Sequence, residues 1–306
     1  MRAAMVALAI AATVTSVAGQ QRFRAGVDLV HFTVVVTDRQ GSPITGLKIE
    51  DFEVIEEGKP QTISYFAEGD ADPGDVLALP LHLGLALDTS GSMEADIRDV
   101  RTAAIKFLNA NEHAVDVTLI DFDTEVRLAR YGASDYARMI ERIRSQKADG
   151  WTAFYDALGV YLNRASEQDG QKIILVYTDG GDTRSSLTYS ELLDLFKASD
   201  VTLYTIGYLE HQPSSVKNEQ RMQLQRMAAL TGGQAFFPMS VKELDKIYEQ
   251  IQKEIAARYS LGYTSSDTRT NGAWRKVQIR LKRSDLKTAK LRTRSGYFAP
   301  YKETRH

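Results

Sequence analysis

The stretch that decides the fold is Leu-His-Leu-Gly-Leu-Ala-Leu-Asp-Thr-Ser-Gly-Ser, residues 81–92. Its first seven residues are almost all apolar, which is typical of a strand buried on both faces of a parallel sheet. Three similar runs follow, and residues with helical spacing separate them. The runs cover residues 115–122, 173–178 and 201–208. This alternation predicts a doubly wound, mostly parallel α/β sheet with helices on both faces.

The segments on either side of this α/β region have the pattern of β strands. Residues 27–66 alternate apolar and polar side chains, and residues 52–55 and 62–66 look like the two arms of a hairpin joined across residues 57–60. Three further strands are expected at residues 259–263, 274–281 and 291–298. Small sheets need a facing layer. We therefore expect both flanks to pack as one small β-sandwich, with the α/β domain inserted between them.

The charges of the two flanks are opposite. The charged residues between positions 50 and 75 are acidic except for Lys59, whereas residues 269–294 are strongly basic. Cross-strand attraction between them is expected to help the pairing modestly. The basic stretch is also a candidate for binding an acidic surface or lipid, although charges that alternate along a strand usually mark its solvated face.

These patterns divide the 306 residues into six parts. Residues 1–19 have the charge, apolar run and small residues of a signal peptide, with an uncleaved anchor as the alternative. We expect a β segment at residues 20–68, a linker at 69–79, the α/β domain at 80–257, a second β segment at 258–300 and a tail at 301–306. The protein is thus expected to be exported to the periplasm or the extracellular space, without a transmembrane span after cleavage.

Composition excludes several kinds of chemistry. The chain has no cysteine, so disulfides, zinc–thiolate sites and cysteine nucleophiles are excluded. The net charge of −2 gives no general reason to expect nucleic acid as a partner. The histidines are scattered, and neither a Gly-x-Ser-x-Gly elbow nor a phosphate-binding loop ending in Lys-Ser/Thr is present. Catalysis is therefore not the expected function.

Oxygen-bearing side chains follow two of the buried strands and precede a helix. Asp88, Ser90 and Ser92 come after the first apolar run, Asp179 comes after the run at residues 173–178, and Thr152 stands just before a helix. Ligands of open α/β sheets bind at the carboxyl ends of the strands. Two carboxylates and three hydroxyls suit a hard divalent cation, Mg²⁺ better than Ca²⁺, with Mn²⁺ or Ca²⁺ as alternatives.

The neutral hydroxyls leave net positive charge on such a cation. It is therefore expected to attract an acidic side chain of a partner protein. The amino ends of the helices after Ser92 and Thr152 should add to this attraction. Three more carboxylates, Asp121, Asp123 and Asp182, are candidates for orienting the metal-binding side chains through hydrogen bonds. For Asp121 and Asp123 the alternative is that they are ordinary polar residues at a strand end, and Asp182 calls for the same caution.

Together these motifs resemble the metal-ion-dependent adhesion site of von Willebrand factor A domains. The resemblance covers residues 79–257 and rests on Asp-x-Ser-x-Ser at 88–92, Thr152, and Thr-Asp-Gly at 178–180. It implies that Ser90, Ser92 and Thr152 lie near the metal and that Asp88 and Asp179 contact it directly or through water. The flanks also resemble a group of exported bacterial proteins related to A domains. A departure is the polar stretch at residues 211–219, either a contact loop or an insertion.

Three functions remain open at this point. The leading one is a metal-dependent, adhesion-type protein-binding module. The second is a structural or assembly factor of the cell envelope with an incidental metal site. The third is a metal-dependent hydrolase with Asp88 as nucleophile, but Ser90 stands where that chemistry needs a second carboxylate. The sequence does not predict the oligomeric state.

Overall fold

The structure is a computed structural model that describes residues 29–69, 79–210 and 212–301. The expected signal peptide, most of the linker and most of the tail lie outside these residues. In the described part of the chain, no helix is long and apolar enough to cross a membrane.

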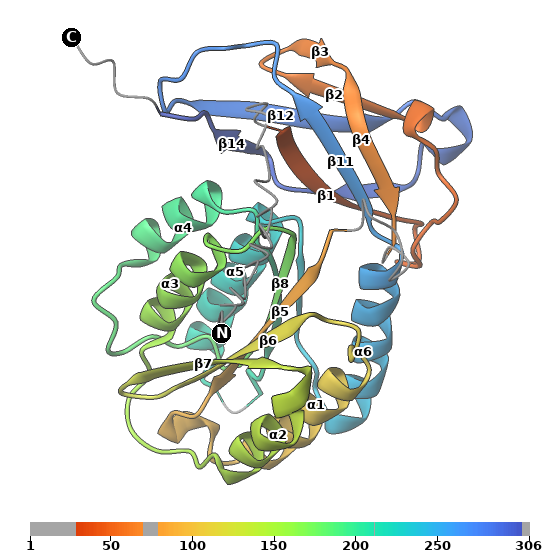
Figure 1. Ribbon diagram of the computed structural model, residues 1–306. Coiled ribbons are helices and arrows are strands. Elements are labelled where there is room, and N and C mark those ends of the chain that lie inside the picture. The colour runs from red at the N-terminus through yellow and green to blue at the C-terminus, as the bar shows by residue number, and fades with distance from the viewer. Residues whose placement is uncertain (1–28, 70–78, 211, 302–306) are drawn as a thin grey trace, which may run out of the picture.

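A six-stranded sheet forms the centre of the larger unit (Figure 1). The strand order is β10-β9-β8-β5-β6-β7, and all neighbours are parallel except β6 and β7. β5 lies in the interior of the sheet and is buried along its whole length. The predicted doubly wound, mostly parallel sheet is confirmed. Its strands are β5 (Leu81–Asp88), β6 (Asp116–Phe122), β7 (Val126–Gly132), β8 (Gln171–Thr178), β9 (Thr202–Gly207) and β10 (Gln234–Phe236).

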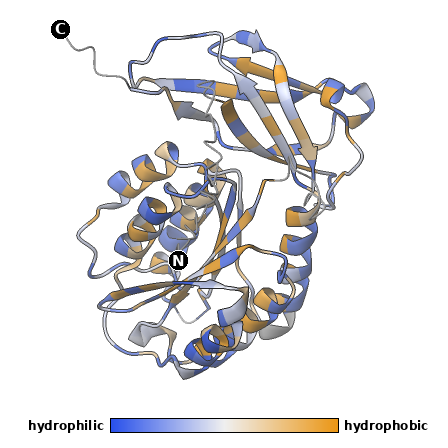
Figure 2. Cartoon of the chain, in the orientation of Figure 1, coloured by the Kyte–Doolittle hydropathy of each residue, from blue (hydrophilic) through white to orange (hydrophobic). Residues whose placement is uncertain are grey.

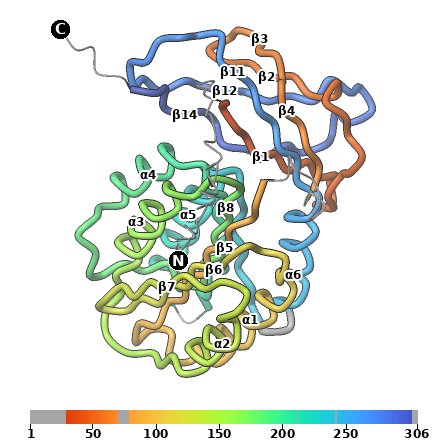
Figure 3. The backbone as a smooth tube through the Cα atoms, viewed as in Figure 1, coloured from red at the N-terminus to blue at the C-terminus, as the bar shows by residue number. Residues whose placement is uncertain are grey.

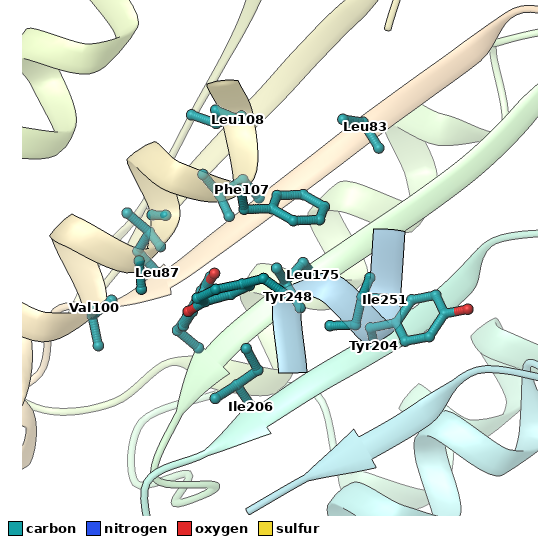
Figure 4. Packing of buried hydrophobic residues seen from close by; sticks show 14 of the residues in the cluster. Leu83, Leu87, Val100, Phe107, Leu108, Leu175, Tyr204, Ile206, Tyr248 and Ile251 are labelled. Atoms are coloured by element: carbon teal, nitrogen blue, oxygen red, sulfur yellow. The ribbon is translucent and has the colours of Figure 1, made fainter. Parts of the chain in front are cut away.

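Helices cover both faces of this sheet. One face packs on α1 (Ile97–Asn109), α2 (Tyr136–Ser145) and α6 (Val241–Ala256), and the other on α3 (Phe154–Ala165), α4 (Tyr189–Ala198) and α5 (Ser214–Leu230). Leu83 and Leu87 of β5 lie in the same core as Phe107 of α1 and Ile251 of α6 (Figure 4). Successive residues of a strand point to opposite faces, so Ala86 belongs to the other core. The hydropathy colours in Figure 2 show the apolar strands inside and polar outer faces on the helices.

The flanks form a β-sandwich of two four-stranded sheets. Their strand orders are β13-β1-β11-β4 and β14-β12-β2-β3, so each sheet mixes strands from both ends of the chain, as predicted. Phe32, Val34, Tyr259, Leu261 and Val277 are buried in the core that the two sheets share. The strands are β1 (Leu29–Thr37), β2 (Phe52–Glu56), β3 (Lys59–Gln61), β4 (Ile63–Glu68), β11 (Tyr259–Thr264), β12 (Trp274–Leu281), β13 (Lys290–Arg292) and β14 (Gly296–Phe298).

The hairpin predicted between residues 52–55 and 62–66 is wrong in its second arm. Glu57 and Gly58 have φ values of 47° and 81°, and Glu56 pairs directly with Lys59. This two-residue turn with positive φ at both positions brings β3 beside β2. β4 instead joins the opposite sheet, where it pairs with β11.

Two other boundaries also differ from the prediction. The strand expected at residues 291–298 is split into β13 and β14, which belong to different sheets. In the polar stretch at residues 211–219 the sequence leaves the start of the helix open, and the structure places it at Ser214, so residues 214–219 belong to α5. Its polar residues cover the exposed side of that helix.

Buried polar groups join the two units. The fully buried carboxylate of Glu254, near the end of α6, accepts a hydrogen bond from the hydroxyl of Tyr204 in β9 at 3.0 Å. It also pairs with Arg292 of β13 at 2.5 Å. Arg258, buried between α6 and β11, donates to Gln171 and to the carbonyl of Ile255. The sandwich is therefore fastened to the α/β unit by specific bonds, and Figure 3 shows α6 running directly into it.

Breaking this junction should destabilise the protein. We expect Arg292→Leu to lower the free energy of unfolding by about 3 kcal/mol, because it leaves the buried Glu254 without its cation. Urea unfolding followed by circular dichroism measures the change. Lys106→Ala is the control: it breaks an ion pair with Asp245 in which both side chains are more than half exposed, and should cost less than about 1 kcal/mol. Equal losses in the two variants would contradict this account of the junction.

His31 of β1 makes folding sensitive to acid. Burial, followed by the nearby Arg294, lowers its pKa to about 4, and its Nε2 has no hydrogen-bond partner among the residues that the structure describes. Protonation therefore favours the unfolded chain, in which the pKa of histidine is about 6.5. The stability contributed by neutral His31 is complete above pH 6.5 and is lost as the pH falls towards 4. We expect His31→Gln to remove up to about 3 kcal/mol of this loss. Unfolding curves between pH 4 and 8 measure it, with His113→Gln at the surface as control.

Candidate functional site

Asp88 is the buried centre of the site. It ends β5 with no exposed surface, and its Oδ1 accepts hydrogen bonds from the Ser90 amide at 3.0 Å and the Ser90 hydroxyl at 2.6 Å. The Ser92 hydroxyl lies 3.1 Å from that of Ser90. Since the proton of Ser90 goes to Asp88, Ser92 donates in this second bond. Ser90 is buried and Ser92 is exposed, so the row of oxygens leads from the core to the surface.

The second segment follows β8. The hydroxyl of Thr178 donates to the other carboxylate oxygen of Asp88 at 2.7 Å and accepts from the Gly180 amide at 2.9 Å. Asp179 is also buried, and it accepts from the Gly181 amide and from the side chain of Gln212 at 2.8 Å. The residue pattern gave no sign of Gln212, which lies in the polar stretch that the sequence leaves open as a contact loop or an insertion.

The ionised form of Asp88 is unfavourable because Asp88 is buried and a second carboxylate, that of Asp179, lies nearby. Burial, and after it the negative charge of Asp179, raises the pKa of Asp88 to about 7. In the described part of the chain, neither Asp88 nor Asp179 forms an ion pair with a basic side chain. Uncompensated buried charge is costly, and a bound cation would offset that cost.

Thr152 belongs to a third loop that is tied to the other two. The Gly91 amide donates to the carbonyl of Gly150 at 3.1 Å, and the Asp149 amide donates to the carbonyl of Thr89 at 2.9 Å. On its other side, Thr152 donates from its amide to the Thr183 hydroxyl at 2.9 Å. The structure thus joins Asp88, Ser90 and Ser92 directly, and it holds Thr152 beside them through the backbone.

The donor set fits a small, hard cation. Among the described residues there is no group of three or more His, Cys, Asp or Glu side chains suited to a metal. The five predicted residues contribute two carboxylates and three hydroxyls, a set outside that definition. So few charged ligands suit Mg²⁺, which keeps several of its waters, better than Ca²⁺, which takes six to eight oxygens.

The other three predicted carboxylates have partners of their own. Asp121 is bound by Arg127 at 2.5 Å and by the Nε of Arg142 at 2.9 Å, and Asp123 is bound by Arg127 at 2.6 Å. Asp182 accepts from the Tyr155 amide at 3.1 Å and from the Ser185 hydroxyl at 2.6 Å. None of these bonds reaches a predicted ligand, so a supporting role for the three stays a prediction.

The bonds of Asp182 also correct the expected contribution of a helix end. Asp182 and Ser185 bind the amides of Tyr155 and Asp156 in the first turn of α3. Amide groups that are already bonded offer little to an anion. A short 3₁₀ turn (Gly91–Met93) stands between the Ser90 loop and α1, which begins only at Ile97. The two helix ends are therefore not the anion-attracting groups that the sequence led us to expect.

Open α/β sheets bind their ligands at the carboxyl edge, and in this chain oxygen-bearing side chains line that edge. The von Willebrand factor type A domain model matches residues 82–250, more than half of the chain, and the protein belongs to this family. No curated protein sequence matches the chain significantly.

Several solved structures have a similar fold. The pilus adhesin SpaC from Lactobacillus rhamnosus GG is 11% identical with a TM-score of 0.50, and the match covers 84% of this chain and 49% of that one. A von Willebrand factor type A protein from Catenulispora acidiphila is 13% identical over 92% of this chain and 76% of its own, with a TM-score of 0.46. The BatB protein from Bacteroides thetaiotaomicron is 15% identical over 57% and 98%, with a TM-score of 0.45. At these identities the likeness concerns the fold alone.

The raised pKa of Asp88 generates a test without metal. In chelator, Asp88→Asn should stabilise the protein above pH 7 by about 1–3 kcal/mol, because it removes a buried negative charge beside Asp179. A folded-state pKa above the usual 3.8 means that ionisation favours unfolding, so the gain should be absent near pH 4 and grow up to pH 7. Urea unfolding across this range measures it. A variant that is less stable than the native chain at pH 8 would contradict this account.

Proposed function

We propose that the protein is an exported, non-enzymatic binding module in which a divalent cation captures an acidic group of a partner protein. The ligands are Asp88, Ser90, Ser92, Thr152 and Asp179, and Mg²⁺ is the proposed cation, with Mn²⁺ or Ca²⁺ as substitutes. The observation that carries the proposal is a pair of neighbouring buried carboxylates that have no basic partner among the described residues, at an edge where hydroxyls lead out to solvent.

The hydroxyls account for the proposed mode of binding. A cation held by few carboxylates keeps positive charge, and coordination positions filled by water stay open to a partner's carboxylate. The chain itself holds the geometry: Thr178 and the Ser90 amide fix Asp88, while Gln212 and the Gly181 amide fix Asp179. SpaC, a pilus adhesin of similar fold, supports a role in adhesion or assembly for this chain. This chain spans about half of the length of SpaC.

Metal binding is expected to stabilise the fold. At a Mg²⁺ or Mn²⁺ concentration one hundred times the dissociation constant, the native chain should gain about 2.7 kcal/mol. Urea unfolding with metal and with chelator measures the gain. Asp88→Ala and Asp179→Ala should lose it, whereas Asp285→Ala, a surface carboxylate of the sandwich, should keep it. If Mg²⁺, Mn²⁺ and Ca²⁺ all leave the native chain unchanged, the metal site is wrong.

Partner binding separates this proposal from the structural or assembly role. A protein partner that stays bound in chelator and to Asp88→Ala would show that the sandwich makes the contact and that the metal is incidental. Loss of binding under both conditions supports the cation-dependent module.

A further inference from the structure

Trp151 is exposed beside the site. Tryptophan is the largest apolar side chain and is usually mostly buried, yet this one is 65% exposed. It directly precedes Thr152, which is 5% exposed, and it follows Gly150, whose carbonyl accepts from the Gly91 amide, so Trp151 belongs to the loop beside the oxygen-lined edge. In the described part of the chain, no aromatic ring packs against it.

The backbone that carries Trp151 is fixed by hydrogen bonds. Five successive amides, from Asp149 to Ala153, are all donors in bonds of 2.8–3.0 Å. The Trp151 amide donates to the hydroxyl of Thr124. Gly150 has φ +76°, and a Cβ there would lie 2.6 Å from the same hydroxyl, so the loop needs glycine. A partner that covers Trp151 therefore meets a loop that is already ordered, and little entropy is lost.

An exposed tryptophan on an ordered loop next to a charged site is typical of an interface anchor. Trp is enriched among the residues that dominate binding energy, and it contributes most where the partner excludes water. A partner that buries only its carboxylate at the site would leave the indole exposed to water. A partner with an apolar side chain next to its carboxylate satisfies both features at once.

We infer that Trp151 is a specificity-determining residue, which selects partners whose acidic residue is flanked by apolar side chains. This inference rests on the proposed function, since the carboxylate is placed at the cation. In this inference the cation binds any acidic group, and Trp151 discriminates among the partners that carry one.

Fluorescein-labelled peptides test the inference through their anisotropy. The probes are Leu-Asp-Leu, Gly-Asp-Gly and Leu-Asn-Leu, each extended by glycines and titrated with the full chain in Mg²⁺ and in chelator. We expect Leu-Asp-Leu to bind about tenfold more tightly than Gly-Asp-Gly in Mg²⁺. Trp151→Ala should abolish this preference while Gly-Asp-Gly binding stays within twofold. Tyr301→Ala, which removes an aromatic side chain 73% exposed on the sandwich unit, should retain the preference.

A second measurement reports on the indole itself. The chain has two tryptophans, and Trp274 contacts Phe298 in the sandwich. In Trp274→Phe, Trp151 is the remaining fluorophore, and its emission should shift to shorter wavelength when Leu-Asp-Leu binds.

The outcomes separate this inference from the proposed function. Equal affinity for Leu-Asp-Leu and Gly-Asp-Gly in Mg²⁺, with neither bound in chelator, overturns the role of Trp151 and keeps the cation site. The preference for leucine-flanked peptides could also be lost in Trp151→Ala yet persist in chelator and extend to Leu-Asn-Leu. That result supports Trp151 as the anchor and overturns the cation-dependent function. Absence of binding by all three peptides overturns both.

Discussion

The carboxylate of Asp88 is ionisable and has no contact with solvent, and much of the α/β unit is arranged around it. β5 delivers it to the sheet edge from between β6 and β8. Its oxygens are then taken up by Ser90 from the following loop and by Thr178 from the neighbouring strand. These neutral donors stabilise the negative charge only in part, since Asp179 lies close by and raises the pKa. A structural ion pair would supply a basic side chain to such a carboxylate. A buried carboxylate whose pKa is raised in this way is more typical of a functional site.

Other carboxylates of the molecule show the contrast. Asp121 and Asp123 bind arginines, and Glu254 pairs with Arg292. Glu56, buried in the sandwich, accepts from Tyr263 and Tyr297 and lies 3.6 Å from Arg275. Where this protein buries a carboxylate for structural reasons, it provides a guanidinium. In the described part of the chain, Asp88 and Asp179 depart from that rule, and they do so at the carboxyl edge of the sheet.

Sequence patterns predicted the features that depend on local periodicity. The buried strands β5, β8 and β9 stand out because both of their faces are apolar, and the ligand candidates follow from the ends of these strands. β7, α2, α4 and β10 were not predicted. β7 was missed because an edge strand that is only partly buried has no continuous apolar run. The split between β13 and β14 was missed for another reason. Residues 293–295 change sheets through long-range contacts, such as that of Arg294 with the carbonyl of His31, which no local pattern encodes.

The placement of the α/β unit decides which way the site faces. The chain leaves the sandwich after β4 and returns to it at β11, and these strands pair with each other, Glu68 opposite Tyr259. Gln171, at the start of β8, contacts Arg258 and Ser260 at this junction. β8 runs parallel to β5, so the amino ends of the central strands lie near the sandwich. The eight residues of β5 then carry Asp88 about 26 Å away from it. The sandwich thus holds one end of the sheet, and the opposite end, where β5 ends at Asp88, lies away from the sandwich (Figure 1).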